Sequence, residues 1–187
     1  MPLTTYTAGQ VLTAASLNAN LSFAATNGLT LIKAQTIGTT VGSVTVSDAF
    51  STTYDDYQIV VSGGVASADN VLALTLGATA TGYYYRGSSG TYSTNTFSGD
   101  NAQNTTSWTV GVGSVNNLDT VIQLRQPFVA KNTLYNSTGV RSATNGIFLQ
   151  YGGYLANTTS YTAFTITALT GTMTGGTIYV YGYQKAV

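Results

Sequence analysis

The chain has 187 residues, and only 6% of them are charged, whereas an ordinary soluble domain carries about 25%. Six basic and six acidic side chains are scattered along it, which excludes a basic surface for nucleic acid, and we expect neither a membrane-spanning segment nor a signal peptide. His and Cys are absent, so the commonest general base, the thiol nucleophile and the usual zinc ligands are excluded as well.

The first 28 residues differ from the rest because their apolar positions follow helical spacing. Thr13 is a suitable N-cap, residues 14–26 predict a short helix, and Gly28 is suited to end it. Three leucines of this arm are candidates for attachment: Leu12, Leu17 and Leu21. Two interpretations stay open: the helix packs on its own chain, or the arm docks on a neighbouring subunit.

From Leu29 onward apolar and polar residues alternate, which is the pattern of strands with one covered face. The candidates are Leu31, Ile37, Val44 and Val46; Tyr57, Ile59 and Val61; Leu72, Leu74 and Leu76; Trp108, Val110 and Val112; Ile122 and Leu124; Ile147, Leu149 and Tyr151; Phe164 and Ile166; and residues 177–184. Many short strands without intervening helices indicate a sandwich or barrel. We predict an all-β domain over residues 29–187, a β-sandwich of jelly-roll type with about eight strands, preceded by the arm over residues 1–28.

The final strand is apolar on both faces. Ile178 and Val180 alternate there with Tyr179, Tyr181 and Tyr183. This pattern fits a central strand, or a strand whose tyrosines are covered by a neighbouring chain. Ordinary core packing of the tyrosines is the alternative.

Two stretches rich in small polar residues, 87–106 and 131–145, predict long surface loops, where binding usually occurs. Aromatic residues and one cation gather beside and within the first stretch: Tyr83, Tyr84, Tyr85, Arg86, Tyr92 and Phe97. Rings, hydroxyls and a guanidinium favour binding surfaces, on which a sugar can stack.

Four of these residues are the candidate surface-binding positions: Tyr83, Tyr85, Arg86 and Tyr92. Successive side chains of a strand point to opposite faces, so either Tyr84 or its two neighbours should belong to the core. Core packing is therefore the other interpretation of this cluster.

Little in the sequence points to catalysis or metal binding. Asp55 and Asp56 are the only adjacent acids, but they lead into a strand and would face opposite ways, which does not suit acid–base work on one bond. A calcium site would require distant residues to meet through loops: Asp48, Asp69, Asp100 and Asp119. We expect no catalytic residue, no metal and no cofactor.

A resemblance to known proteins begins with residues 6–20, which read YTAGQVLTAASLNAN and resemble the N-terminal segment of many tail-fibre and appendage proteins of tailed bacteriophages. Residues 31–38, 50–57 and 175–182 resemble a β-sandwich module common in phage virion surface proteins. The resemblance implies a homo-oligomer, most often a trimer, attached through its N-terminal segment. This chain departs from many of these proteins in lacking a longer shaft, which favours a short appendage or a capsid protein over a long fibre.

Three functions follow for comparison. The first is a structural virion protein of the tail, such as a short tail fibre or receptor-binding module, with other virion proteins and a host surface glycan as candidate partners. The second is a capsid decoration, or cement, protein that braces the capsid surface. The third is a polysaccharide-degrading enzyme, which the scarcity of paired carboxylates disfavours. We expect a non-enzymatic protein of the virion without nucleic-acid or membrane partners.

Overall fold

The structure is a computed structural model, and it describes residues 5–11, 13–18, 28–143 and 145–185. Strands account for 58% of the residues and helix for 3%, which confirms the predicted all-β class. The twelve strands are β1 Leu29–Thr36, β2 Ser43–Val46, β3 Asp56–Ala66, β4 Asn70–Leu76, β5 Tyr83–Thr91, β6 Thr96–Thr105, β7 Trp108–Gly113, β8 Leu118–Arg125, β9 Thr133–Arg141, β10 Ile147–Leu155, β11 Phe164–Ala168 and β12 Met173–Tyr183.

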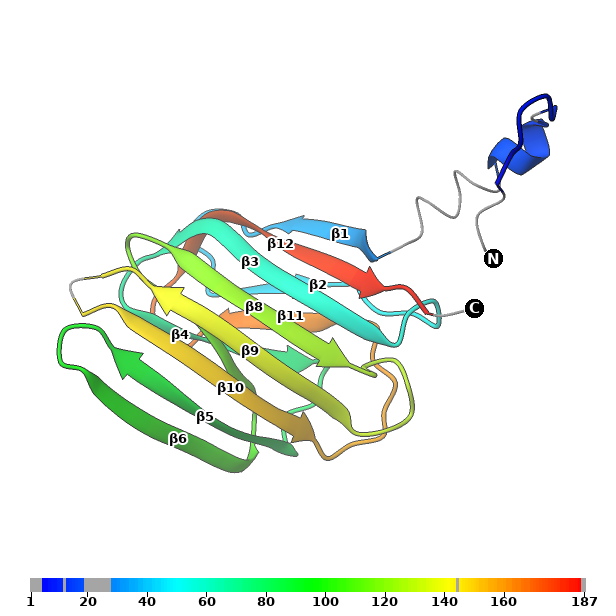
Figure 1. Cartoon of the computed structure of the whole chain (residues 1–187). Helices are drawn as coiled ribbons and strands as arrows, with labels where there is room; N and C mark the ends of the chain where they lie inside the picture. The colour runs from blue at the N-terminus through cyan, green and yellow to red at the C-terminus, as the bar shows by residue number, and fades with distance from the viewer. Residues whose placement is uncertain (1–4, 12, 19–27, 144, 186–187) are drawn as a thin grey trace.

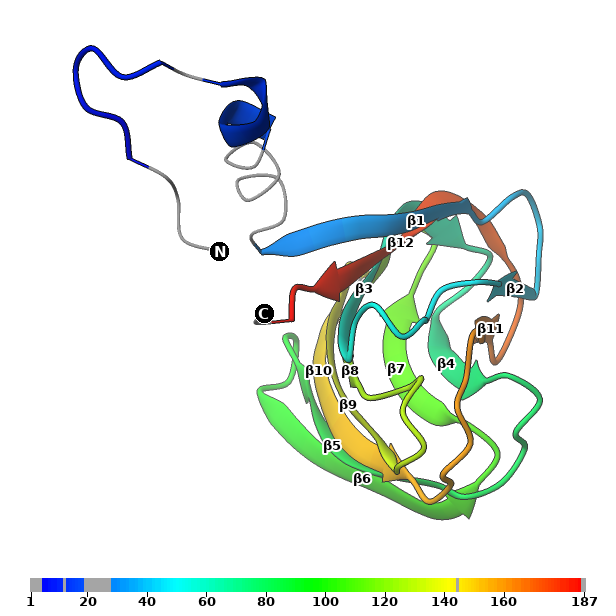
Figure 2. The ribbon, with the colours of Figure 1, turned by 90° about the vertical axis from the view of Figure 1, so that its right-hand side faces the viewer.

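The strands form two antiparallel layers that face each other (Figure 2). The larger layer has the order β1-β12-β3-β8-β9-β10-β5-β6, and the smaller has the order β2-β11-β4-β7. Only two residue pairs join β7 to β8, at the turn where the chain passes from one layer to the other. Four pairings are nested along the sequence: β1 with β12, β2 with β11, β3 with β8 and β4 with β7.

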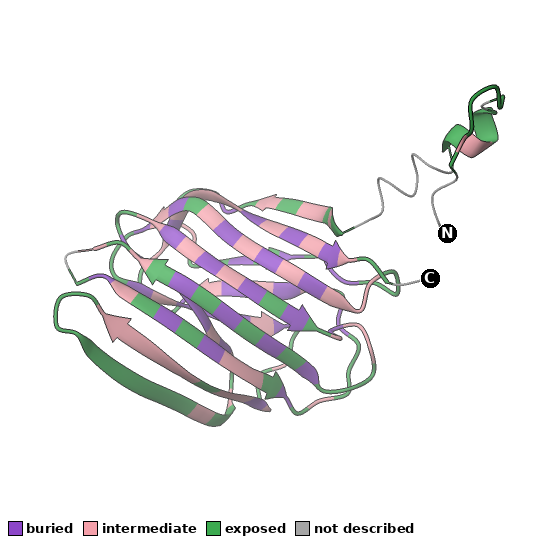
Figure 3. Ribbon diagram, viewed as in Figure 1, coloured by how far each residue is buried: buried purple, intermediate pink, exposed green. Residues whose placement is uncertain are grey.

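The core lies between the layers because alternate residues of each strand point inward. Figure 3 shows this alternation as bands along the strands of the larger layer. Trp108 is fully buried near the middle, with its ring centroid 5.0 Å from that of Tyr83 and 4.5 Å from that of Tyr135. Its indole nitrogen donates to the carbonyl oxygen of Tyr154 at 3.3 Å, so the one polar atom of this side chain is satisfied.

The structure has twelve strands where the sequence predicts about eight, because both predicted loops contain strands and the predicted series from Leu31 to Val46 is divided between β1 and β2. Residues 87–106 contain the end of β5 and all of β6, and residues 131–145 contain β9. The buried face of β9 includes the polar residues Thr133 and Ser137. The segment therefore lacks the alternation of large apolar residues from which a strand is predicted. β6 is an edge strand exposed along most of its length, and its sequence therefore shows no apolar alternation.

The N-terminal arm begins its helix at the predicted cap. Thr13 Oγ1 accepts a hydrogen bond from Ser16 N at 3.2 Å, and residues 14–18 are helical. The described part of the arm lies away from the sandwich in Figure 1, and the Leu17 side chain is 41% exposed. The other two attachment candidates, Leu12 and Leu21, lie outside the described residues, as does the rest of the predicted helix.

Candidate functional site

Tyr83 is part of the core, so its assignment to a binding surface is wrong. Its side chain is fully buried, and its hydroxyl accepts from Leu76 N at 2.8 Å and donates to Thr79 O at 3.1 Å. Burial raises the pKa of Tyr83 to about 12, because the charged phenolate would lose its solvation. Tyr85 also points inward and meets Tyr151 edge-on at 5.7 Å, as the alternation of a strand requires.

Tyr84 points outward and forms the aromatic part of a surface site. Its ring stacks on that of Tyr154 from β10, with centroids 4.9 Å apart and an interplanar angle of 3°. Arg86 lies on the same face two residues further along β5, where it is exposed. Its register partners are Gly152 on β10 and Asn101 on β6. Tyr154 could not be predicted as part of this site, because only the register of β10 with β5 brings it to Tyr84.

A groove of about 490 Å³ opens beside this stacked pair. Its lining includes Tyr84, Arg86, Asn101, Gln103, Gly152 and Tyr154, and the predicted binding residue Tyr85 also contributes to it although its ring packs against the core. Gly152 is the register partner of Arg86 on β10 and has no side chain, so the groove stays open on the β10 side of Arg86. Arg86 is the one charged residue of the lining, and the two ion pairs among the described residues join Arg141 to Asp69 and Lys185 to Asp55.

A second aromatic cluster lies at the other end of β5. Phe97 is 73% exposed and Tyr92 is 67% exposed, and together with Gly90 and Phe148 they line a hollow of about 430 Å³. A Cβ atom on Gly90 would lie 3.2 Å from the Phe97 ring, so this ring rests beside the glycine. Tyr92, a predicted binding residue, is thus on the surface, but it is separated along β5 from Arg86.

Tyr151 fastens the two outermost strands from the inner face. Its ring occupies the space that a side chain on Gly87 would fill, and its hydroxyl donates to Asp100 Oδ2 on β6 at 3.1 Å. Burial, together with the nearby Asp100 charge, raises the pKa of Tyr151 and keeps the hydroxyl protonated as a donor. These two contacts of Tyr151 hold together β5 and β6, the strands that carry Arg86 and Asn101.

The outer side of β12 forms a third surface, which we call the tyrosine face: Tyr179, Tyr181, Tyr183 and, on β1, Leu29 and Leu31. Ile178 and Val180 are fully buried on the opposite side, so the core interpretation of the tyrosines is wrong. The rings of Tyr179 and Tyr181 lie 6.4 Å apart, and both leucines are about half exposed. β12 is therefore a central strand with a partly exposed aromatic face.

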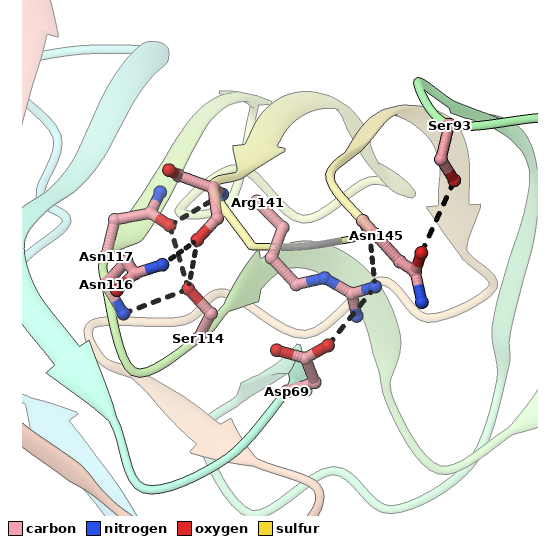
Figure 4. A network of polar contacts seen from close by, with 8 residues as sticks. Asp69, Ser93, Ser114, Asn116, Asn117, Arg141 and Asn145 are labelled. Atoms are coloured by element: carbon pink, nitrogen blue, oxygen red, sulfur yellow. Dashed lines mark hydrogen bonds and ion pairs between the residues drawn. The ribbon is translucent and has the colours of Figure 1, made fainter.

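A polar network joins the β7–β8 turn to the end of β9 (Figure 4). The single hydroxyl hydrogen of Ser114 is shared between two acceptors, Asn117 Oδ1 at 3.1 Å from Oγ and the carbonyl oxygen of Ser142 at 2.9 Å. Asn116 Nδ2 donates to the same carbonyl at 2.7 Å, and Asn117 Oδ1 accepts from Ser142 N at 2.9 Å. These groups satisfy one another, so the network holds the turn in place instead of offering a site for a ligand.

The acidic residues have separate partners. Asp55 pairs with Lys185 at 2.8 Å, whereas Asp56 begins β3 opposite Arg125. Within the described ranges, no three His, Cys, Asp or Glu side chains gather where they would hold a metal ion. No helix in the part of the chain that the structure describes is long and apolar enough to cross a membrane.

Protein-family models and curated proteins give no match to this chain. The described residues form a β-sandwich with two exposed aromatic clusters along β5 and a tyrosine face on β12 and β1.

Proposed function

We propose that this chain is a structural, non-enzymatic protein of a tailed-bacteriophage virion, namely a short tail appendage or receptor-binding module that assembles as a homotrimer. The virion setting of this proposal rests on the resemblance of residues 6–20 to tail-fibre and appendage proteins, and the assembly of copies rests on the tyrosine face. The solvated face of an antiparallel sheet is normally polar, whereas this one carries three tyrosines beside two half-exposed leucines. Covering it with a second copy would remove apolar area from water, and such patches commonly mark interfaces.

The nested strand pairings support a jelly roll within this proposal. In a jelly roll of eight strands, the first strand pairs with the last, the second with the next to last, and so on inward. The pairs β1 with β12, β2 with β11, β3 with β8 and β4 with β7 follow this order, and β5, β6, β9 and β10 extend the larger layer. Jelly rolls recur in viral capsid proteins and lectins, which fits a protein of a particle surface.

The two ends of the sandwich differ in a way that supports an appendage. The arm enters β1 at Leu29, while the tip of the β5–β6 hairpin lies at the opposite end (Figure 1). Tyr92 N donates to Gly146 O at 3.0 Å there, and Ser93 Oγ donates to Asn145 Oδ1 at 3.4 Å. The turns of the two polar stretches therefore gather away from the arm, as a receptor-binding module would need.

Capsid decoration is the second candidate, and it is favoured by the position of the tyrosine face directly beside the exit of the arm. Leu29 is the first residue of β1 and pairs with Tyr183, so arm and face together would brace neighbouring capsid subunits. In this alternative the face contacts another virion protein instead of a second copy.

Counting copies per purified particle by quantitative mass spectrometry tests the proposal and separates the two candidates. An appendage is expected in a small number that matches the symmetry of the tail. A number in the hundreds, scaling with the capsid lattice, would support decoration instead. Absence of the chain from purified particles would overturn both.

A further inference from the structure

We propose that the outer face along β5 binds an acidic oligosaccharide. We call this surface the β5 strip: the outward residues from Tyr84 to Gly90 together with their neighbours on β6 and β10. The stacked Tyr84–Tyr154 pair forms one end of the strip, and Phe97 and Phe148 form the other. The inference rests on the proposed virion function only for where such a ligand would be met, on a host surface. Binding itself is tested on the purified protein.

The shape of the strip fits a chain of several sugar rings. Tyr84 and Gly90 are six residues apart on one strand, which corresponds to about 20 Å. Between the two aromatic ends, the small residues Ser88 on β5, Gly99 on β6 and Gly152 on β10 are interspersed with longer polar side chains: Arg86, Asn101 and Gln150. The small residues leave open space beside these polar side chains, so an extended ligand can contact both aromatic ends and the polar groups between them.

The polar groups of the strip suit the hydroxyls of a sugar. Asn101 and Gln103 line the groove beside Tyr84, and Gln150 pairs with Ser88 halfway along β5. An amide group both donates and accepts hydrogen bonds, as a sugar hydroxyl does. The aromatic rings offer flat apolar surfaces to the C–H faces of the same ligand, which is the division of labour seen at other aromatic binding surfaces.

The charge of the strip favours a ligand with carboxylates. Arg86 is exposed two residues along β5 from Tyr84, takes part in neither ion pair among the described residues, and has no acidic neighbour in the groove lining. Asp100 is the nearest acid on β6, but it is hydrogen-bonded to Tyr151 on the inner face. A guanidinium binds a carboxylate through two parallel hydrogen bonds. A nucleic acid would need several cations along its backbone, and the strip has one.

Isothermal titration calorimetry on the purified full chain tests the inference with four probes: hexagalacturonate, its carboxyl-reduced neutral form, monomeric galacturonate and a hexamer of thymidine nucleotides. We expect hexagalacturonate to bind at least tenfold more tightly than each of the other three. Failure of hexagalacturonate to bind, equal binding of the neutral hexamer or of the monomer, or tighter binding of the oligonucleotide would each overturn the inference. The copy-number measurement is independent of all these outcomes.

Variants locate the site. Tyr84→Ala, Tyr154→Ala and Phe97→Ala are each expected to weaken binding of hexagalacturonate at least fivefold, and Arg86→Gln should reduce the preference for the acidic over the neutral hexamer. Leu169→Ala is the matched control, because Leu169 is an apolar residue that is 57% exposed and follows β11 in the other layer, outside both the β5 strip and the tyrosine face. Lys33→Gln is the control for charge, since this cation lies on β1. Circular dichroism confirms that each variant folds, and unchanged binding in the folded strip variants would contradict the proposed site.

Discussion

Replacing Tyr83 by Phe is expected to destabilise the sandwich, because the variant keeps the ring but removes the hydroxyl. Leu76 N would then lose its acceptor and Thr79 O its donor, at a position that is fully buried. A buried polar group left without a partner costs about 1–3 kcal/mol. We expect the free energy of unfolding, measured with urea at pH 7, to fall by about 2 kcal/mol.

The wild type and the Tyr83→Phe variant also allow a second test, in which the free energy of unfolding is measured as a function of pH. The pKa of Tyr83 is 10.0 in its ordinary state and about 12 in the fold, so folding favours the neutral phenol. This stabilisation is complete below pH 10 and is lost as the pH rises toward and through 12. The advantage of the wild-type protein over the Tyr83→Phe variant should therefore shrink between pH 10 and 12, while other tyrosines titrate in both proteins and cancel.

Tyr92→Phe is the control, because Tyr92 is 67% exposed and its substitution should change stability by less than about 0.5 kcal/mol. Equal effects of the two substitutions at pH 7, or a difference between wild type and Tyr83→Phe that stays constant from pH 9 to 12, would refute the account of Tyr83 as a buried, hydrogen-bonded core residue.

Three further predictions concern the register, the polar network and the arm. Gly153→Ala is expected to lower the free energy of unfolding by about 1–3 kcal/mol, because its Cβ atom would clash with the Tyr84 carbonyl oxygen. Gly99→Ala is the control and should change little, because the nearest atom to its Cβ would be Gly87 O at 4.0 Å. Equal melting temperatures of the two variants would contradict the register of β5 with β10. Ser114→Ala removes the bonds to Asn117 and Ser142 and should cost about 1–3 kcal/mol in urea unfolding, and a cost below about 0.5 kcal/mol would show that the network is not structural. Deletion of residues 1–27 should leave a sandwich with an unchanged melting temperature that no longer joins particles, and incorporation of the truncated protein would contradict attachment through the arm.

The fold class could be predicted from the sequence because most core strands alternate large apolar residues with polar ones. In β3, for example, Tyr57, Ile59 and Val61 are fully buried while their neighbours are partly exposed. β6 and β9 escaped prediction for two different reasons. β6 has almost no covered face, and β9 buries Thr133 and Ser137 against a core in which larger residues of neighbouring strands fill the volume.

The candidate site was predicted only in part. The cluster around Arg86 was recognisable as rings and a cation close together in sequence, and alternation correctly indicated that one set of rings is core. The sequence could not decide which set, and it gave no sign that Tyr154 stacks on Tyr84 or that Phe148 joins Phe97. Both partners come from β10, and only the pairing of β10 with β5 brings them to the strip.

The measurement that tests the central claim most directly is the mass of the purified full chain in solution, by light scattering, for the wild type and for Tyr181→Asp. The account predicts a wild-type particle of three times 19.4 kDa, and a folded Tyr181→Asp variant at the mass of one chain, because a charge in the tyrosine face would oppose its burial between copies. A wild-type protein that stays monomeric at high concentration, or a variant that still forms the trimer, would contradict it.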